Sequence, residues 1–154
     1  MIKENELIGL KYNVKVEVEN IETGEVEEIK VHNLVTNLGK QLIRDFLRKE
    51  SVDGLNYIAI GTDNTAPVVG NTTLGAEVFR DIFTDVLVDG NKVTFKYFLS
   101  STDANSNTLV EAGLFGNDAT VTANSGLLFA HVIHAPIEKN SAVAITYSWE
   151  ISIS

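Results

Sequence analysis

The sequence contains no cysteine among its 154 residues, and this absence excludes several kinds of chemistry. Disulfide bonds, thiolate metal sites and a cysteine nucleophile all require a residue type that the chain lacks. A chain of this length can bury about 70 % of its unfolded surface, so it needs no crosslink in order to fold. The length and composition therefore predict one globular domain over residues 1–154, without a domain linker.

Positive charge is also scarce in this chain. Lysine and arginine number 12 against 21 aspartate and glutamate residues, which gives a formal net charge of −9. A surface of this sign repels the phosphate backbone of nucleic acids. The one basic cluster, Lys40, Arg44, Arg48 and Lys49, has the spacing of the solvated side of a helix. We therefore expect no nucleic-acid partner.

Long hydrophobic runs are missing as well. No apolar run approaches the ~20 residues that a membrane-spanning helix needs. The first six residues, Met-Ile-Lys-Glu-Asn-Glu, are polar and acidic, and they do not resemble a signal peptide. We therefore expect no membrane association, and a protein that either stays in the cytoplasm or leaves it by a route other than secretion, such as lysis.

Alternation of apolar and polar residues is the clearest pattern in the chain. Residues 10–19 alternate strictly, and residues 25–31 return as a second strand with a bulge at Glu27–Glu28, so 10–31 is predicted to be a hairpin. Residues 143–153 place large and aromatic side chains on one face, which predicts a central strand of a sheet. Further strands are predicted at 55–60, 77–88, 92–99, 108–115 and 127–134, with a turn at Asp89–Gly90. Pro136 marks either the end of the 127–134 strand or an edge position.

One helix is predicted, over about Asn37–Lys49. Its apolar positions recur at helical spacing: Leu38, Leu42, Ile43, Phe46 and Leu47. This single stripe predicts that the helix packs on a sheet or closes one end of it. Together with eight or so strands over 10–31 and 55–154, it predicts a mainly β fold, an antiparallel two-sheet sandwich that is jelly-roll-like in character.

Three charged residues, Glu77, Arg80 and Glu111, lie where the pattern is otherwise apolar. An unpaired buried charge costs several kcal/mol, so these side chains should be paired or close to the surface. One interpretation is a pair of carboxylates for acid–base catalysis. The other is a structural ion network, in which Arg80 pairs with Glu111 or Glu77 and ties a long loop to the following strands. We favour the structural network, because no nucleophile motif accompanies these residues.

The remaining polar residues do not predict a metal or cofactor site. His131 and His134 have opposite parity on a strand, so they point to opposite faces and are poor candidates for a shared metal site. Residues 103–107 supply the first ligands of a calcium loop, but Thr108 and Leu114 stand where it needs glycine and glutamate. The long loops at 61–73 and 116–126 are candidate interface loops, represented by Gly61, Asp63, Asn64, Pro67, Asn117 and Asp118.

A succession of short motifs runs through the chain from Asn33. It comprises Asn33-Leu-Val-Thr-Asn-x-Gly39, Tyr57-Ile-Ala-Ile-Gly61-Thr, Ala66-Pro67, Thr73-Leu74 with Glu77 and Arg80, Glu111-Ala-Gly-Leu-Phe115, Gly126-Leu-Leu-Phe-Ala130 and a last strand with Trp149. This order resembles a group of small bacteriophage virion proteins, found among tail-fibre or tail-appendage proteins and other particle-surface structural proteins. The resemblance implies a non-enzymatic, β-rich subunit of the virion that assembles symmetrically with other virion proteins, often as a homotrimer. It brings no catalytic residues.

Three functions follow as hypotheses. The first is a capsid decoration (cement) subunit or a component of the tail or baseplate. The second is a receptor-binding or carbohydrate-binding head that would contact a host-surface glycan, but most aromatic residues fall on rows predicted to be buried, which leaves Phe79, Phe83 and Phe98 as candidates for a sugar platform. The third is a hydrolase that uses Glu77 or Glu111.

Overall fold

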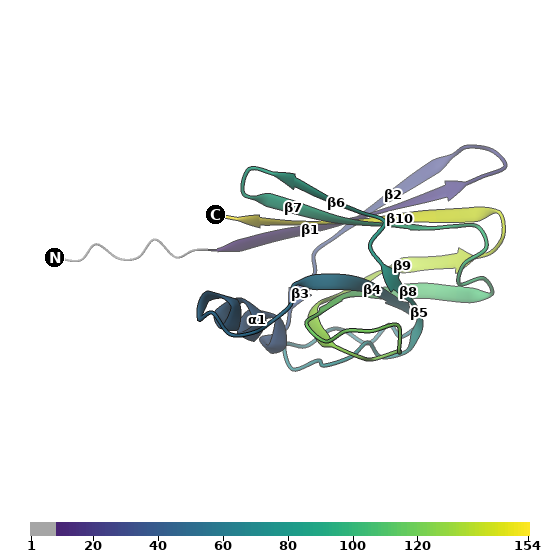
Figure 1. Cartoon of the computed structure of the whole chain (residues 1–154). Coiled ribbons are helices and arrows are strands. Elements are labelled where there is room, and N and C mark those ends of the chain that lie inside the picture. Colours follow the sequence, from purple (N-terminus) through teal and green to yellow (C-terminus); the bar gives the residue numbers. More distant parts are fainter. Residues whose placement is uncertain (1–8) are drawn as a thin grey trace.

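The computed structural model describes residues 9–154 and arranges them as two facing antiparallel sheets of five strands each (Figure 1). Sheet A has the strand order β2-β1-β10-β7-β6, and sheet B has the order β3-β9-β8-β4-β5. The mainly β, two-sheet sandwich with one helix is therefore confirmed. The polar stretch 1–6, which was predicted not to be a signal peptide, lies outside the described residues. Within 9–154, no helix is long and apolar enough to cross a bilayer.

The strands of sheet A are β1 (Leu10–Asn20), β2 (Val26–Val31), β6 (Asp85–Asp89), β7 (Lys92–Leu99) and β10 (Val143–Ile153). Those of sheet B are β3 (Leu34–Val35), β4 (Leu55–Gly61), β5 (Glu77–Ile82), β8 (Asn107–Gly116) and β9 (Leu127–Lys139). The helix α1 spans Asn37–Leu47 and packs against β9. It begins as predicted, because the Thr36 side chain accepts a hydrogen bond from the Gly39 N–H at 3.0 Å.

The core lies between the two sheets and consists of the inward rows of their strands. β10 pairs with β1 on one side and β7 on the other, so its predicted central position is confirmed. Its inward side chains Ile145, Tyr147 and Trp149 are fully buried against residues of β8 such as Leu109 and Leu114. Burying one large apolar side chain contributes roughly 1.5–3 kcal/mol, so these rows hold the sheets together.

The two ends of the described chain lie side by side. Gly9 donates its N–H to the Ser154 carbonyl at 3.0 Å, and Ser154 donates its N–H to the Gly9 carbonyl at 2.8 Å. These bonds extend the β1–β10 ladder, in which β1 begins where β10 ends. Both ends therefore emerge at the end of the sandwich where α1 lies (Figure 1).

The bulge predicted at Glu27–Glu28 is wrong. β2 pairs with β1 without interruption, from Val14 opposite Val31 to Glu19 opposite Val26. β2 is an edge strand with mostly exposed side chains, so the slip in its apolar pattern does not require an extra residue. For Pro136 the edge alternative holds: β9 continues past it to Lys139, and there only β8 lies beside β9 in the sheet.

The single strand predicted at 77–88 is in fact two strands in different sheets. β5 belongs to sheet B and β6 to sheet A, and Phe83 and Thr84 carry the chain from one sheet to the other (Figure 1). The Phe83 ring packs on Phe95 with a centroid distance of 4.8 Å, and the Thr84 N–H donates to the Lys96 carbonyl at 2.9 Å. The predicted turn at Asp89–Gly90 joins β6 to β7, with Gly90 at φ +58°.

Candidate functional site

The outer face of sheet B, turned away from sheet A, is covered by the two long loops of the chain. Leu74 from the loop 62–76 and Ala119 from the loop 117–126 are buried against Phe115 and Leu128 of the sheet. These loops contain the candidate interface loops predicted at 61–73 and 116–126. They form a second, small core with sheet B, and two buried polar networks fix them there.

The first network is centred on Glu111 of β8, whose carboxylate receives four hydrogen bonds. Oε1 accepts from the N–H groups of Ala76 at 2.7 Å and Asp63 at 3.3 Å. Oε2 accepts from the Gly75 N–H at 3.0 Å and lies 2.8 Å from His131 Nε2. Three of these donors are backbone groups of the loop 62–76, so the side chain holds both ends of that loop against the sheet.

These bonds also determine the ionisation of Glu111. Burial by itself would raise the pKa of the carboxyl group, but the hydrogen bonds from His131 and from the N–H groups of Ala76, Gly75 and Asp63 outweigh that effect. The pKa of Glu111 therefore lies below its ordinary value, because all these partners stabilise the charged form. At neutral pH the side chain is a carboxylate.

His131 connects Glu111 to the loop 62–76 through its two ring nitrogens. Its Nε2 lies 2.8 Å from Glu111 Oε2, and its Nδ1 lies 3.1 Å from Asn71 Oδ1. The same Asn71 oxygen accepts the Val68 N–H at 2.9 Å. Glu111 and His131 are therefore a buried hydrogen-bonded pair that also reaches Asn71 in the loop 62–76.

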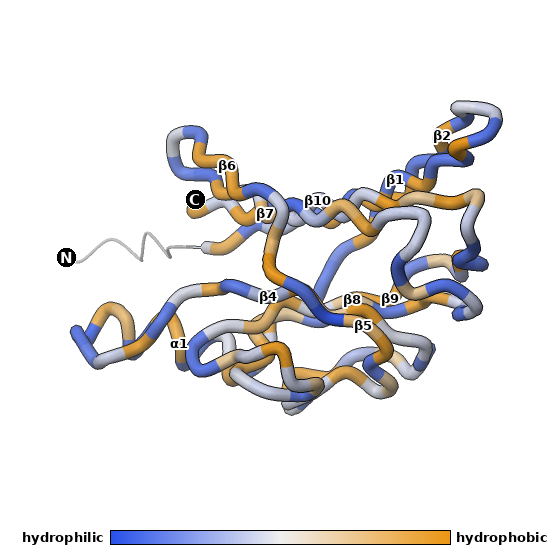
Figure 2. The backbone as a smooth tube through the Cα atoms, turned by 45° about the vertical axis from the view of Figure 1, so that its right-hand side comes forward, coloured by the Kyte–Doolittle hydropathy of each residue, from blue (hydrophilic) through white to orange (hydrophobic). Residues whose placement is uncertain are grey.

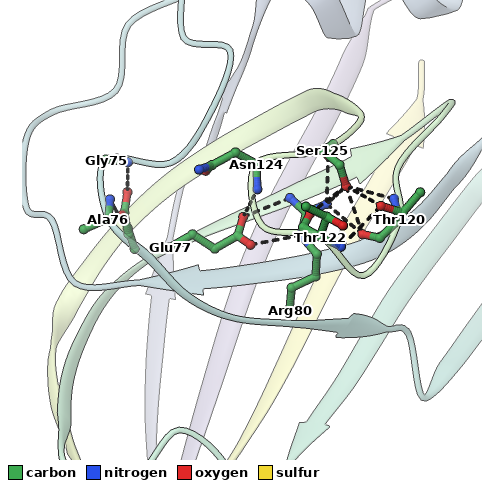
Figure 3. A network of polar contacts seen from close by, with 9 residues as sticks. Gly75, Ala76, Glu77, Arg80, Thr120, Thr122, Asn124 and Ser125 are labelled. Atoms are coloured by element: carbon green, nitrogen blue, oxygen red, sulfur yellow. Dashed lines mark hydrogen bonds and ion pairs between the residues drawn. The ribbon is translucent and has the colours of Figure 1, made fainter.

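The second network joins Arg80 and Glu77 of β5 to the loop 117–126 (Figure 3). The guanidinium group makes a bidentate pair with Glu77, at 3.0 Å from Nε and 2.9 Å from Nη2. Its Nη1 donates to the carbonyl groups of Ser125 at 2.8 Å and Thr120 at 3.2 Å. The guanidinium carbon also lies 4.2 Å from the centroid of the Phe115 ring, a cation–π contact.

The predicted structural network of Glu77, Arg80 and Glu111 is thus divided into two. Arg80 pairs with Glu77, one of the two partners considered, and Glu111 pairs with His131 instead. β4 lies between β5 and β8 in sheet B, which keeps Arg80 and Glu111 two strands apart. β9 is the direct neighbour of β8, and this places His131 within reach of Glu111.

His134 lies on the opposite face of β9 from His131, as its parity predicted. Its Nδ1 donates to the Ala135 carbonyl at 2.8 Å, and its Nε2 accepts the Tyr147 hydroxyl at 3.1 Å inside the core. Burial lowers the pKa of His134 and raises that of Tyr147, so both stay neutral. Among residues 9–154, no cluster of three or more His, Asp or Glu could hold a metal ion.

The six residues proposed for interface loops differ in accessibility. Gly61 is buried at the end of β4, and a Cβ there would overlap Glu111 Oε1 and the Ala76 carbonyl oxygen. Its prediction as an interface residue is therefore wrong: glycine is needed because the carboxylate approaches the backbone. Asn64 and Asp118 are exposed, whereas Asp63, Pro67 and Asn117 are half-buried.

An apolar groove at the end of the sandwich was not predicted from the sequence. This end groove has a volume of about 540 Å³ and lies between α1 and the ends of β1, β7 and β10. Its apolar lining residues are Leu10, Leu42, Ile43, Phe46, Leu47, Val52, Leu55, Val93, Phe95, Phe129, Ile151 and Ile153. In Figure 2, hydrophobic stretches of α1 and of β6 and β7 lie at this end of the molecule.

The last turn of α1 is the exposed wall of the end groove. Leu42 is buried, but Phe46 is 73 % exposed and Leu47 is 78 % exposed. The apolar stripe was expected to pack on a sheet or to close one end of it, and Phe46 and Leu47 are not buried in either way.

Comparison with protein-family models, curated proteins and solved structures gives no match for this chain.

Proposed function

We propose that this chain is a non-enzymatic structural subunit of a bacteriophage particle, either a capsid decoration protein or a tail or baseplate component. We propose further that it joins its neighbours through the end groove. The observation that carries the proposal is that Phe46 and Leu47, two large apolar residues that line the end groove, are exposed to solvent. Burying either side chain in an interface would contribute roughly 1.5–3 kcal/mol, and exposed apolar patches of this kind mark interaction sites.

The burial and the contacts of Glu77, Arg80 and Glu111 support a structural role for these residues. The side chains of Glu77 and Arg80 are 2 % exposed, and Glu111 is fully buried. Their charged atoms contact loop groups, each other or His131, and none of these residues lines the end groove. Carboxylates arranged in this way are not accessible to a substrate. The order of motifs in the sequence, which resembles small virion proteins, supports the assignment to a phage particle.

The favoured partner is a further copy of the chain, in a symmetric homotrimer, with other virion proteins as additional neighbours. The test compares the molar mass of the wild-type protein in solution with that of Leu47→Asp. A charge at this position should dissociate the oligomer and leave the thermal midpoint of the monomer unchanged, because the side chain makes few contacts within the subunit. Val121→Asp, equally exposed on the loop 117–126, is the matched control and should remain oligomeric.

Two results would overturn this proposal. One is a wild-type protein that stays monomeric and binds no capsid or tail sub-assembly of its particle. The other is an oligomer that survives Leu47→Asp and Phe46→Asp unchanged, which would show that the end groove is not the contact.

The receptor-binding or carbohydrate-binding head is the weaker candidate. Phe79 packs against Tyr97 at a centroid distance of 5.7 Å, and Phe83 packs on Phe95, so neither ring is free for a sugar. Phe98 is exposed on sheet A, away from Phe46 in the end groove. Isolated rings of this kind do not form the aromatic platform that a neutral sugar requires.

A further inference from the structure

The outer face of sheet A carries a second hollow, which the proposed function does not use. It has a volume of about 590 Å³ and is open to solvent over β2, β1, β10 and β7. Lys30, Lys15, Ser148 and Lys96 occupy directly opposed positions on these four neighbouring strands. Opposed residues of an antiparallel ladder point to the same face, so the four side chains form one row across this sheet A hollow.

The row concentrates positive charge in a chain whose net charge is −9. Lys15 and Lys30 are directly opposite each other, an arrangement of like charges that destabilises a sheet. Each has a carboxylate on its own strand, Glu17 and Glu28, at 3.2 Å. These pairs are solvent-exposed, and such pairs contribute roughly 0–1 kcal/mol. The lysines are therefore only weakly neutralised.

Lys96 is the least neutralised member of the row. It is half-buried, and within residues 9–154 it has no carboxylate within ion-pair distance. Asp85 stands opposite it on β6, but the two side chains do not form an ion pair. A half-buried ammonium group that makes no ion pair favours the binding of an anion beside it.

Ser148 provides an independent observation at the centre of the row. The residue is only 7 % exposed, and its Oγ has no hydrogen-bond partner. A buried polar group left without a partner costs about 1–3 kcal/mol, so such groups are rare in folded proteins. The hydroxyl lies between Lys15 and Lys96, where it could donate to an oxygen atom that both ammonium groups attract.

We propose that the sheet A hollow binds a small ligand through an oxyanion, that is, a carboxylate, sulfate or phosphate group. Ser148 Oγ donates a hydrogen bond to the anion, and Lys15 and Lys96 supply the charge, with Lys30 at the rim. The volume fits a small molecule. Glu17, Glu28 and Glu150 surround the row, so an extended polyanion such as a nucleic-acid backbone would be repelled.

The test titrates inorganic phosphate, and separately glucuronate, into the isotope-labelled wild-type protein at constant ionic strength, with amide chemical shifts as the readout. We expect saturable shifts at Lys15, Lys96 and Ser148 with at least one of the two probes. Saturation by phosphate alone identifies an inorganic anion as the ligand, and tighter binding of glucuronate identifies an acidic sugar. In either case Lys96→Gln should weaken binding by about tenfold or more, which is the effect of removing one charge-assisted bond.

Two controls make the result decisive. Lys11→Gln removes the same charge from an exposed position of β1 that does not line the hollow, and it should leave the affinity unchanged. Ser148→Ala should weaken binding without lowering stability, because it removes a hydroxyl that has no partner. Shifts that do not saturate with either probe, or an equal loss in Lys96→Gln and Lys11→Gln, would overturn the proposal. These binding measurements do not depend on whether the end groove is a contact between subunits, so they test the sheet A hollow separately from the proposed function.

Discussion

His131 Nε2 lies 2.8 Å from Glu111 Oε2, and the two side chains are only 4 % and 1 % exposed. The pair joins two neighbouring strands of sheet B, and through Glu111 it also holds the loop 62–76. The Glu111 carboxylate is thus an acceptor that several buried donors share. Removing it is costly, because a buried donor left without an acceptor loses about 1–3 kcal/mol.

Replacing the carboxylate by an amide tests this relationship. We expect Glu111→Gln to lower the free energy of unfolding by about 3 kcal/mol or more, because four hydrogen bonds lose a charged acceptor and each such bond contributes about 1.5–3 kcal/mol. Urea denaturation measures the change. Glu28→Gln, which removes a carboxylate from an exposed pair with Lys30, is the control and should change stability by less than about 0.5 kcal/mol. Equal effects of the two substitutions would contradict the structural role of Glu111.

The same carboxylate should make stability depend on pH in the acid range. The pKa of Glu111 is lower in the folded protein than its ordinary value of 4.5, so the unfolded chain binds more protons as the pH falls. Its contribution is complete above pH 4.5 and is lost as the pH falls through the folded pKa. Unfolding free energies measured from about pH 3 to pH 6 should therefore fall more steeply with acid in the wild type than in Glu111→Gln. Parallel curves would exclude a depressed pKa.

Arg80→Lys tests the network that joins Arg80 and Glu77 to the loop 117–126. The substitution keeps the positive charge but removes the planar guanidinium group, which donates several hydrogen bonds at once. A lysine cannot pair bidentately with Glu77 and at the same time reach the carbonyl groups of Thr120 and Ser125. We expect a loss of about 1.5–3 kcal/mol. Hydrogen exchange should also become faster in the loop 117–126 and stay unchanged in the loop 62–76. Arg48→Lys, in an exposed pair with Glu50, is the control, and its exchange pattern should match that of the wild type.

Gly39→Ala should destabilise the protein, although alanine is the better helix former. Helix propensity alone would give a gain of up to about 1 kcal/mol. In the structure, however, a Cβ at Gly39 would overlap the Phe129 carbonyl oxygen of β9, so the helix would have to move away from the sheet. We expect a net loss of about 1–3 kcal/mol, measured by thermal unfolding. Gly70→Ala, where a Cβ would meet nothing within 4 Å, is the control and should not lower the midpoint.

The features that local periodicity determines could be predicted from the sequence. The inward row of β10, from Ile145 to Ile151, is buried where strict alternation placed it, and α1 begins at the predicted residue Asn37. The Arg80–Glu77 pair does not belong to this class, because residues three apart on a regular strand point to opposite faces. The two side chains meet where the β4–β5 register shifts between Ile60 and Gly61.

The features that depend on strand order could not be predicted in the same way. Glu111 meets His131 because β8 and β9 are neighbours, and Arg80 misses Glu111 because β4 separates their strands. No local pattern reveals this order. The covering of sheet B by the loops depends on single apolar residues, such as Leu74 and Ala119, within otherwise polar segments. The exposure of Phe46 depends on how far α1 extends beyond the sheet.

The pairing of Gly9 with Ser154 makes the subunit mechanically anisotropic. A force that separates these two residues would open the β1–β10 ladder from one end, one pair of residues after another. A force between Ser154 and the turn after Asn20 would instead act along both strands and load all eleven opposed pairs together. The protein should therefore resist a force along β1 and β10 far better than a force that separates Gly9 from Ser154.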